Sequence, residues 1–473
     1  MSGTSCRWYQ VSIPATASFE SGEGIIDTEH VVVDSGSVVG TAPRLAEGIE
    51  LIGEYQGSGF VQAPYIVRRA DGQVIQLPRL LYLLAAGLDG ERDHEALARV
   101  LSAEIGKVVQ ADQVAFLLDN RLRPVGIVAD DPVSGELDTG KRKMAVKSDP
   151  LLALKFRVGV VPERVVWRIA GLFGPMFWPP VILAALTAFV GLDVLIIAQG
   201  GLGQIVPSAV ALVYQPALTL LVIGLLLVSA AFHECGHVAA CRYGGAKPGV
   251  MGFGLYLVWP ALFSTVTDSY RLSRVGRLRT DLGGVYFNAV FITGMCAAYL
   301  DTGSPWLLVA IVALHVETAT QFLPMIRLDG YYILSDLIGV PDLFSRMGPV
   351  LASIIPGRPT HPRVQELKPW ARRTITVWVL IVVPYLGYWL IGFLWVIPKV
   401  LPVVWDRLVY LCRTVGATAA EGHIAETMLG VVQVILLLIP WVGSLLMLGM
   451  MARRPVRWLL TRSPIARLRA GRA

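Results

Sequence analysis

The stretch that decides the fold of this chain reads LLVIGLLLVSAAFHECGH and covers residues 220–237. Residues 207–232 hold no Asp, Glu, Lys or Arg, and His233, Glu234 and His237 follow directly. On a helix, side chains four residues apart share a face, so both imidazoles can reach one metal ion with the glutamate beside them. Polar residues at a helix end can also be purely structural, but ionisable groups in an apolar span are costly and usually functional. The pattern predicts a metal site at one end of a membrane span.

The composition divides the chain into a soluble part and a membrane part. Of the 473 residues, 54% are apolar and only 16% are charged, against about 25% charged in soluble domains. The chain is mixed and charge-bearing before about residue 170, and beyond that point long apolar runs alternate with short basic loops. We expect a small N-terminal domain followed by a polytopic α-helical membrane domain. No charged start with an apolar core opens the sequence, so we expect no cleavable signal peptide.

Apolar runs and basic loops together predict the topology. A bilayer core needs about 20 apolar residues of helix. Six segments meet this length: 172–198, 207–240, 282–300, 305–326, 374–398 and 428–451. Lys and Arg gather before the first segment and after the second, fourth and sixth, which predicts about six spans with both termini cytoplasmic and explains the net charge of +6. Residues 250–267 are short and interrupted by Gly and Pro260, so we expect an interfacial or re-entrant segment there.

A small α+β domain is predicted over residues 43–130. Two strands flank the Asp71-Gly72 turn within residues 65–77, and three helices and a closing strand follow, at 79–86, 94–105, 111–120 and 124–128. This order resembles the winged-helix, PqqD-like domains of peptide-modification systems, which recognise the leader of a ribosomally made precursor peptide. The resemblance implies that a leader strand pairs with the hairpin edge. Winged helices also bind DNA, but this domain is not strongly basic, so we expect no nucleic-acid partner.

The rest of the chain divides by composition. Residues 1–42 are rich in Ser, Gly and Val without a clear period, which predicts a flexible N-terminal segment. Residues 131–170 are predicted to form a basic linker and juxtamembrane segment, 171–345 the membrane core with the metal site, and 346–473 two further spans and a basic cytoplasmic tail. The five cysteines are scattered and form no CxxC pair, so we expect neither a disulfide framework nor a thiolate metal site.

A second element must complete the metal site. Catalytic zinc usually takes three protein ligands and keeps one position for water. The candidate third ligand is Asp329 in Leu328-Asp329-Gly330, at the cytoplasmic end of the fourth predicted span and therefore at the depth of the histidines. A helix-capping Asp beside a Gly turn is the structural alternative. Glu234 can accept a proton from water at the metal.

The HExxH at 233–237 and the LDG at 328–330 resemble the motifs of the site-2 protease family of intramembrane zinc metalloproteases. The resemblance covers about residues 172–345. It implies four roles, namely Zn²⁺ ligands at His233, His237 and Asp329 and a general base at Glu234.

Three further polar residues are candidate substrate contacts: Asn288, Gln321 and Glu317. Asn288 follows a Gly-Gly pair that is similar to a Gly-rich turn of the family, and it can donate to the substrate backbone or form a plain interhelical hydrogen bond. Gln321 stands where the family's second motif has Asn, so it keeps an amide with a different reach. Glu317 shares a helix face with Gln321, which predicts a polar contact toward the site. We expect His315 to form an interhelical hydrogen bond rather than to bind the metal.

Taken whole, the chain is similar to peptide zinc metalloproteases found beside peptide natural-product genes. The resemblance implies a multi-pass protease of a bacterial-type cell membrane that removes the leader of a ribosomally made peptide. Its expected partners are the precursor, the lipid bilayer and other peptide-modifying enzymes. Two alternatives stay open: a regulated intramembrane protease that cleaves a membrane-anchored signalling protein, and a non-catalytic peptide-binding or export scaffold. The intact Glu234 argues against the scaffold, because a binding-only zinc site needs no base.

Overall fold

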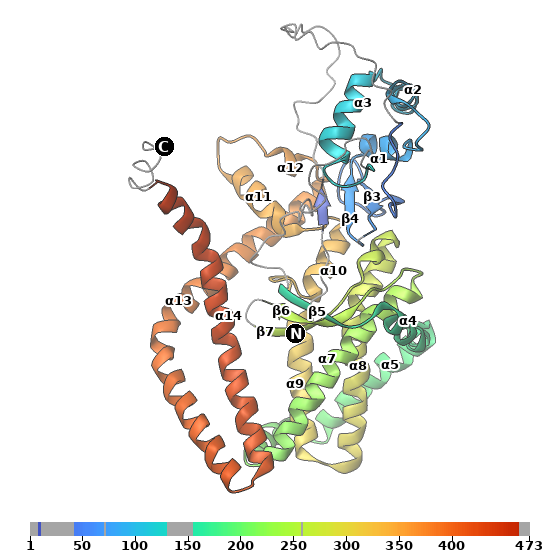
Figure 1. Ribbon diagram of the computed structural model, residues 1–473. Coiled ribbons are helices and arrows are strands. Elements are labelled where there is room, and N and C mark those ends of the chain that lie inside the picture. The colour runs from blue at the N-terminus through green and yellow to red at the C-terminus, as the bar shows by residue number, and fades with distance from the viewer. Residues whose placement is uncertain (1–7, 11–41, 71, 130–154, 257–258, 463–473) are drawn as a thin grey trace. The chain divides into compact units, whose positions relative to one another are not determined.

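A computed structural model describes residues 8–10, 42–70, 72–129, 155–256 and 259–462 (Figure 1). The chain is mostly helical and divides into two compact units. The described residues within 147–341 and 376–473 form the membrane unit, and those within 7–146 and 342–375 form the second unit. The predicted flexible segment and basic linker lie mostly outside the described residues.

Among the described residues, five helices are long and apolar enough to cross a membrane. They are α5 (Pro179–Ala198), α7 (Pro216–Tyr243), α8 (Arg274–Thr302), α13 (Pro369–Ala420) and α14 (Ile424–Arg462), in which Ile424–Ser444 meets the criteria for a span. Only 6% of the apolar window of α5, and the same share for α13, is buried within the described structure. Something other than these residues must cover so much apolar helix surface, as a bilayer does. The chain is mostly helical with five candidate spans, which is consistent with the predicted polytopic helical class.

Several predicted spans differ from the observed helices, and 374–398 is only part of the 52-residue helix α13. The predicted segment 207–240 is divided between α6 (Gly201–Val213) and α7, which begins at Pro216 because proline fits the first turn of a helix. The predicted segment 305–326 is the 17-residue helix α9 (Pro305–Gln321), which is too short to count among the five candidate spans. Residues before a proline disfavour helix, which is consistent with the end of α9 before Pro324.

Helix α8 packs against α7, α9 and α5. Gly236 and Gly283 make the contact between α7 and α8 close, because a Cβ on either glycine would collide with the backbone carbonyl of the other. Small residues are what allow two helix backbones to approach in this way. The close contact fixes the buried end of α7 against the first half of α8.

A three-stranded antiparallel sheet covers this end of the helices. Its order is β5 (Lys155–Val161), β6 (Met251–Tyr256) and β7 (Trp259–Ser264). The predicted interfacial or re-entrant segment 250–267 is thus a β-hairpin, and it is not a seventh helical span. Ala261 and Phe263 of β7 pack on Leu328. The hairpin therefore supports the backbone that carries Asp329.

The second unit contains the predicted hairpin, β3 (Tyr65–Arg68) and β4 (Val74–Leu77), although Asp71 of its turn lies outside the described residues. The sheet order is β1-β4-β3-β2, and β1 (Trp8–Gln10) and β2 (Glu50–Glu54) were not predicted. Helices α1 (Arg79–Ala86) and α2 (His94–Ile105) have the predicted bounds, and α3 (Ala111–Leu117) continues as a π-helix over Leu118–Leu122.

The predicted closing strand at 124–128 is wrong. Only Val128 pairs there, in an isolated bridge with Leu45, because the chain leaves the π-helix through a turn that brings Gly126 to a positive φ of 71°. Leu118 and Leu122 of the π-helix, together with Ile127, complete the core beneath Ile75 and Leu81.

A segment distant in sequence completes the second unit. It comprises η5 (Leu343–Arg346), α11 (Met347–Ile354) and α12 (Pro362–Gln365). The backbone N–H of Val61 donates to the Glu366 carbonyl at 2.8 Å, and the N–H of Lys368 donates to the Gly59 carbonyl at 2.8 Å. The basic residues of this segment predict a loop between membrane spans, whereas the structure pairs it with the N-terminal domain.

Candidate metal centre

The buried half of α7 carries the three residues of the HExxH pattern. His233 and His237 are fully buried, and Glu234 is 1% exposed. The two rings lie one helical turn apart, with their Nε2 atoms separated by 3.0 Å. The helical spacing thus brings both imidazoles to one point, as the sequence predicts.

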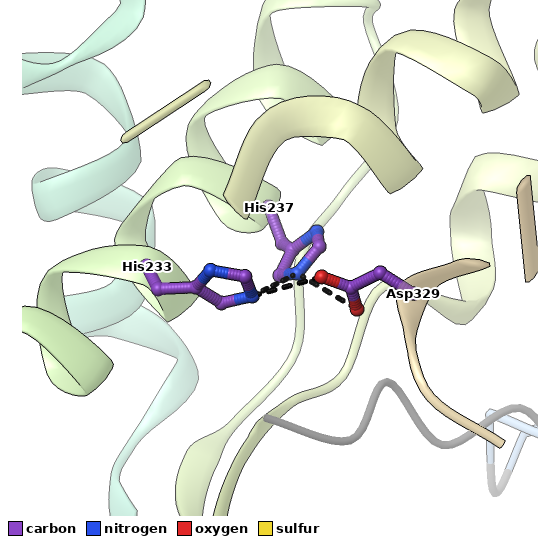
Figure 2. A group of neighbouring side chains, drawn as sticks. All are labelled: His233, His237 and Asp329. Atoms are coloured by element: carbon purple, nitrogen blue, oxygen red, sulfur yellow. Dashed lines mark hydrogen bonds and ion pairs between the residues drawn. The ribbon is translucent and has the colours of Figure 1, made fainter. Parts of the chain in front are cut away.

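Asp329 is the first residue of α10 (Asp329–Ile338) and is fully buried. Its Oδ2 lies 3.0 Å from Nε2 of His233, and its Oδ1 lies 3.5 Å from Nε2 of His237. Figure 2 shows the carboxylate facing the tips of both rings. The predicted third ligand therefore meets the two histidines.

The spacing of these donor atoms fits one metal ion. One ligand atom from each of the three residues lies within 4.8 Å of the others. Donors bound about 2.1 Å from a tetrahedral ion are about 3.4 Å apart, close to the observed 3.0–3.5 Å. The group can hold a metal ion with little rearrangement.

A backbone contact orients one of the rings. Nδ1 of His237 lies 2.8 Å from the Thr280 carbonyl oxygen on α8. A carbonyl oxygen only accepts a hydrogen bond, so Nδ1 carries the proton. Nε2 of His237 then keeps its lone pair, which faces the ligand atoms of His233 and Asp329. Metal-bound histidines commonly have such a second hydrogen bond.

Gly284 of α8 has no side chain, and this leaves room for the rings of the two histidines. A Cβ at this position would collide with Nε2 of both His233 and His237. A residue with a side chain would therefore push the two donor atoms away from Asp329.

The Glu234 carboxylate has no hydrogen-bond partner among the described residues, although both of its oxygens are buried. Leaving a buried carboxylate without a partner is expensive, whereas an ion or water beside it offsets that cost. The position of Glu234 next to two candidate metal ligands suits a group that exchanges protons with water.

The predicted substrate contacts lie between α8 and α9. The buried Asn288 donates from Nδ2 to Oε1 of Gln321 at 3.2 Å and to Oγ1 of Thr318 at 3.1 Å. Asn288 thus makes the interhelical hydrogen bond that was the structural alternative for it. Glu317 is only partly buried, and its contact with Gln321 stays a prediction.

His315 lies outside the metal centre and forms an interhelical hydrogen bond, as predicted. Its Nε2 lies 3.1 Å from Oδ2 of Asp193 on α5, and its Nδ1 lies 2.9 Å from the Ile311 carbonyl oxygen. Cys296 of α8 donates to the other Asp193 oxygen at 3.5 Å. Asp193 was missed, although it is the only charged residue in α5.

The structure also shows a buried ion pair that the sequence analysis missed. Nε of Arg277 on α8 donates to Oδ1 of Asp336 on α10 at 3.0 Å, and Nη1 donates to the Leu272 carbonyl at 3.0 Å. Arg277 belongs to the basic residues after the second predicted span, whose positive charge predicts the topology. The available signal was that Asp336 follows Asp329 by two helical turns on one face of α10.

Comparison with protein-family models, with curated proteins and with solved structures finds no match for this chain.

Proposed function

We propose that the protein is a membrane-embedded zinc metallopeptidase that hydrolyses a peptide bond in a ribosomally made precursor peptide. The observation that carries the proposal is the buried His233–His237–Asp329 donor group with the unpartnered Glu234 carboxylate beside it. A site built only to hold an ion needs no buried carboxylate next to its ligands.

The donor set favours zinc. Two imidazoles and one carboxylate leave a fourth tetrahedral position, as in catalytic zinc sites. Zn²⁺ bound there supplies Lewis acidity and lowers the pKa of water toward neutrality. Harder ions such as Mg²⁺ and Ca²⁺ prefer all-oxygen ligands, so the imidazoles argue against them.

The protein's own groups would carry the protons and orient the peptide. Glu234 accepts a proton from the attacking water and returns it to the leaving amine. The Thr280 carbonyl holds His237 in one tautomer throughout. Asn288 on α8 and Gln321 at the end of α9 carry amide groups that can form hydrogen bonds with the backbone of an extended substrate.

The second unit is the proposed recognition element. We expected a leader strand to pair with an edge of the hairpin, but β1 pairs with β4 and β2 pairs with β3. The described sheet has two edge strands, β1 and β2, and each has a neighbour on one side only. Strand addition would use the outer side of β2, because β2 is the longer of the two edge strands. We further propose a bacterial-type cell membrane with both termini cytoplasmic, an arrangement that satisfies the basic loops and in which α9 crosses as a sixth span.

The test uses the full-length protein in detergent or nanodiscs with candidate precursor peptides. Mass spectrometry should detect a new peptide terminus with the wild type and none with Glu234→Gln, which preserves the size of the side chain. Zinc content should be retained in Glu234→Gln, which separates loss of the base from loss of the site. Cleavage by Glu234→Gln at the wild-type rate would contradict the mechanism.

A further inference from the structure

A second site lies in the membrane unit, in a cavity of about 750 Å³ bounded by α5, α8 and α9. One face of α8, including Leu282, Val285, Ala289 and Ile292, forms a wall of it. Gly284, which contacts the metal-binding histidines, is not among the lining residues. The cavity therefore lies on a different face of α8 from the metal centre.

Most polar groups in the lining already have partners within the protein. His315 bonds to Asp193, and Thr318 bonds to Asn288. The Tyr286 hydroxyl donates to the Met176 carbonyl at 2.9 Å. The remaining lining is apolar, so an occupant must itself be apolar over most of its length.

Arg279 is the polar residue of the lining whose charge is not paired within the described structure. Its Nε is buried without a hydrogen-bond partner, and no carboxylate of the described residues forms an ion pair with it. Its guanidinium carbon lies 4.8 Å from the centroid of the Tyr243 ring, at the end of α7. The cavity thus has a positive charge without an anionic partner at the end where α7 stops and α8 begins.

The length and the lining of the cavity favour a lipid chain over an extended peptide. Ile292 lies thirteen positions after Arg279, which is about 20 Å along a helix and is within the roughly 30 Å hydrocarbon core of a bilayer. An extended peptide would leave its backbone N–H and C=O groups unpaired against apolar walls.

We propose that this cavity binds one anionic phospholipid, with its phosphate at Arg279 and an acyl chain along the α8 face. Arginine binds phosphate through charge-assisted hydrogen bonds, and basic pockets between membrane helices bind anionic head groups. The site is independent of the proposed peptidase activity, since it shares no residue with the metal centre.

Native mass spectrometry of the full-length, delipidated protein tests the site. The probes are phosphatidylglycerol and phosphatidylcholine with identical acyl chains. Wild type should bind phosphatidylglycerol about fivefold more tightly, which is the effect of one favourable charge near a membrane surface. Arg279→Gln should lose this preference and Arg279→Lys should keep it. Arg168→Gln removes an equal charge from an exposed position on α4 (Glu163–Leu172) and should change nothing.

A second variant tests the apolar part of the site. Ala289→Trp places a large side chain in the cavity and should weaken the binding of both lipids. Retained metal content in each variant shows that the membrane unit is folded. An equal affinity of wild type for the two lipids, or an unchanged preference in Arg279→Gln, would overturn the proposal. Displacement of phosphatidylglycerol by a precursor peptide would make the cavity a peptide site instead.

Discussion

Nε of Arg277 lies 3.0 Å from Oδ1 of Asp336, in a buried ion pair that joins α8 to α10. Asp336 lies two turns after Asp329 on α10, and Thr280, which holds His237, lies one turn after Arg277 on α8. One turn of α8 thus orients a histidine and anchors the helix that carries the carboxylate. We infer that Arg277 and Asp336 are positioning residues for the metal centre.

Arg277→Gln should lower metal affinity by roughly 10- to 100-fold, because α10 would lose the anchor that places Asp329. It should also destabilise the protein by about 3–5 kcal/mol, since Asp336 would remain buried without its cation. Competition with a metal-binding dye measures the affinity. Arg271→Gln is the control, because its ion pair with Asp268 is partly exposed and does not involve α10. Equal affinities in the two variants would show that α10 is placed without Arg277.

A glycine pair on α8 gives a sharper test of the geometry. Gly284→Ala should abolish metal binding, because its Cβ would collide with Nε2 of both histidines. Gly294→Ala, on the same helix, places its Cβ where no atom lies within 4 Å and should bind metal normally. Alanine favours helix over glycine by roughly 1 kcal/mol in both cases. Metal content after dialysis distinguishes the variants, and full occupancy in Gly284→Ala would contradict the observed position of the rings.

The sequence predicts those features of the structure that depend on local signals. Helix α2 has its predicted ends because Asp93 accepts a hydrogen bond from the Ala96 N–H and Gly106 adopts the left-handed conformation that ends a helix. The spacing of the HExxH pattern places two candidate metal ligands on one helix face. Asp329 could be predicted because the charge pattern places it at the depth of the histidines.

Long-range pairing could not be predicted. Nothing near Arg277 in the sequence identifies Asp336 as its partner, because the two are 59 residues apart. The pairing of residues 59–61 with residues 366–368 crosses several membrane helices in the sequence. The charge pattern of the sequence predicts only that Arg346 lies in a cytoplasmic loop. In the structure Arg346 is buried, which gives it a structural role.

Removal of the metal should change the unfolding temperature differently in variants of the metal ligands and in a variant of the proposed base. A bound ion at a thousand times its dissociation constant stabilises a protein by about 4 kcal/mol, so chelation should lower the unfolding temperature of wild type. Glu234→Gln should show the same decrease, because Glu234 is not in the donor group. Asp329→Ala should start lower and respond little to the chelator. A wild-type response in Asp329→Ala, measured by thermal unfolding with and without chelator, would exclude Asp329 as a ligand.

The hydrogen bond between Asp193 and His315 should stabilise the contact of α5 with α9. Such bonds inside membrane proteins contribute about 0.6 kcal/mol on average and up to about 1.7. Asp193→Asn and His315→Gln, singly and together, form a double-mutant cycle that measures the coupling by unfolding in denaturing detergent. Metal affinity should stay unchanged, because neither residue belongs to the donor group. A coupling energy near zero would mean that apolar packing alone holds α5 in place.

Arg346 should be the main anchor between residues 342–375 and the N-terminal domain of the second unit. It is 1% exposed, donates to the Arg363 carbonyl at 2.7 Å, and lies over the Phe60 ring at 5.1 Å. Arg346→Met should destabilise this unit by about 2–3 kcal/mol through the lost charge-assisted hydrogen bond and cation–π contact. Hydrogen exchange should therefore accelerate at Val61 and Lys368, whose N–H groups pair the two segments. Arg358→Met, at an exposed position, is the matched control. If exchange at Val61 and Lys368 were equally slow in both variants, the backbone pairing would hold without Arg346.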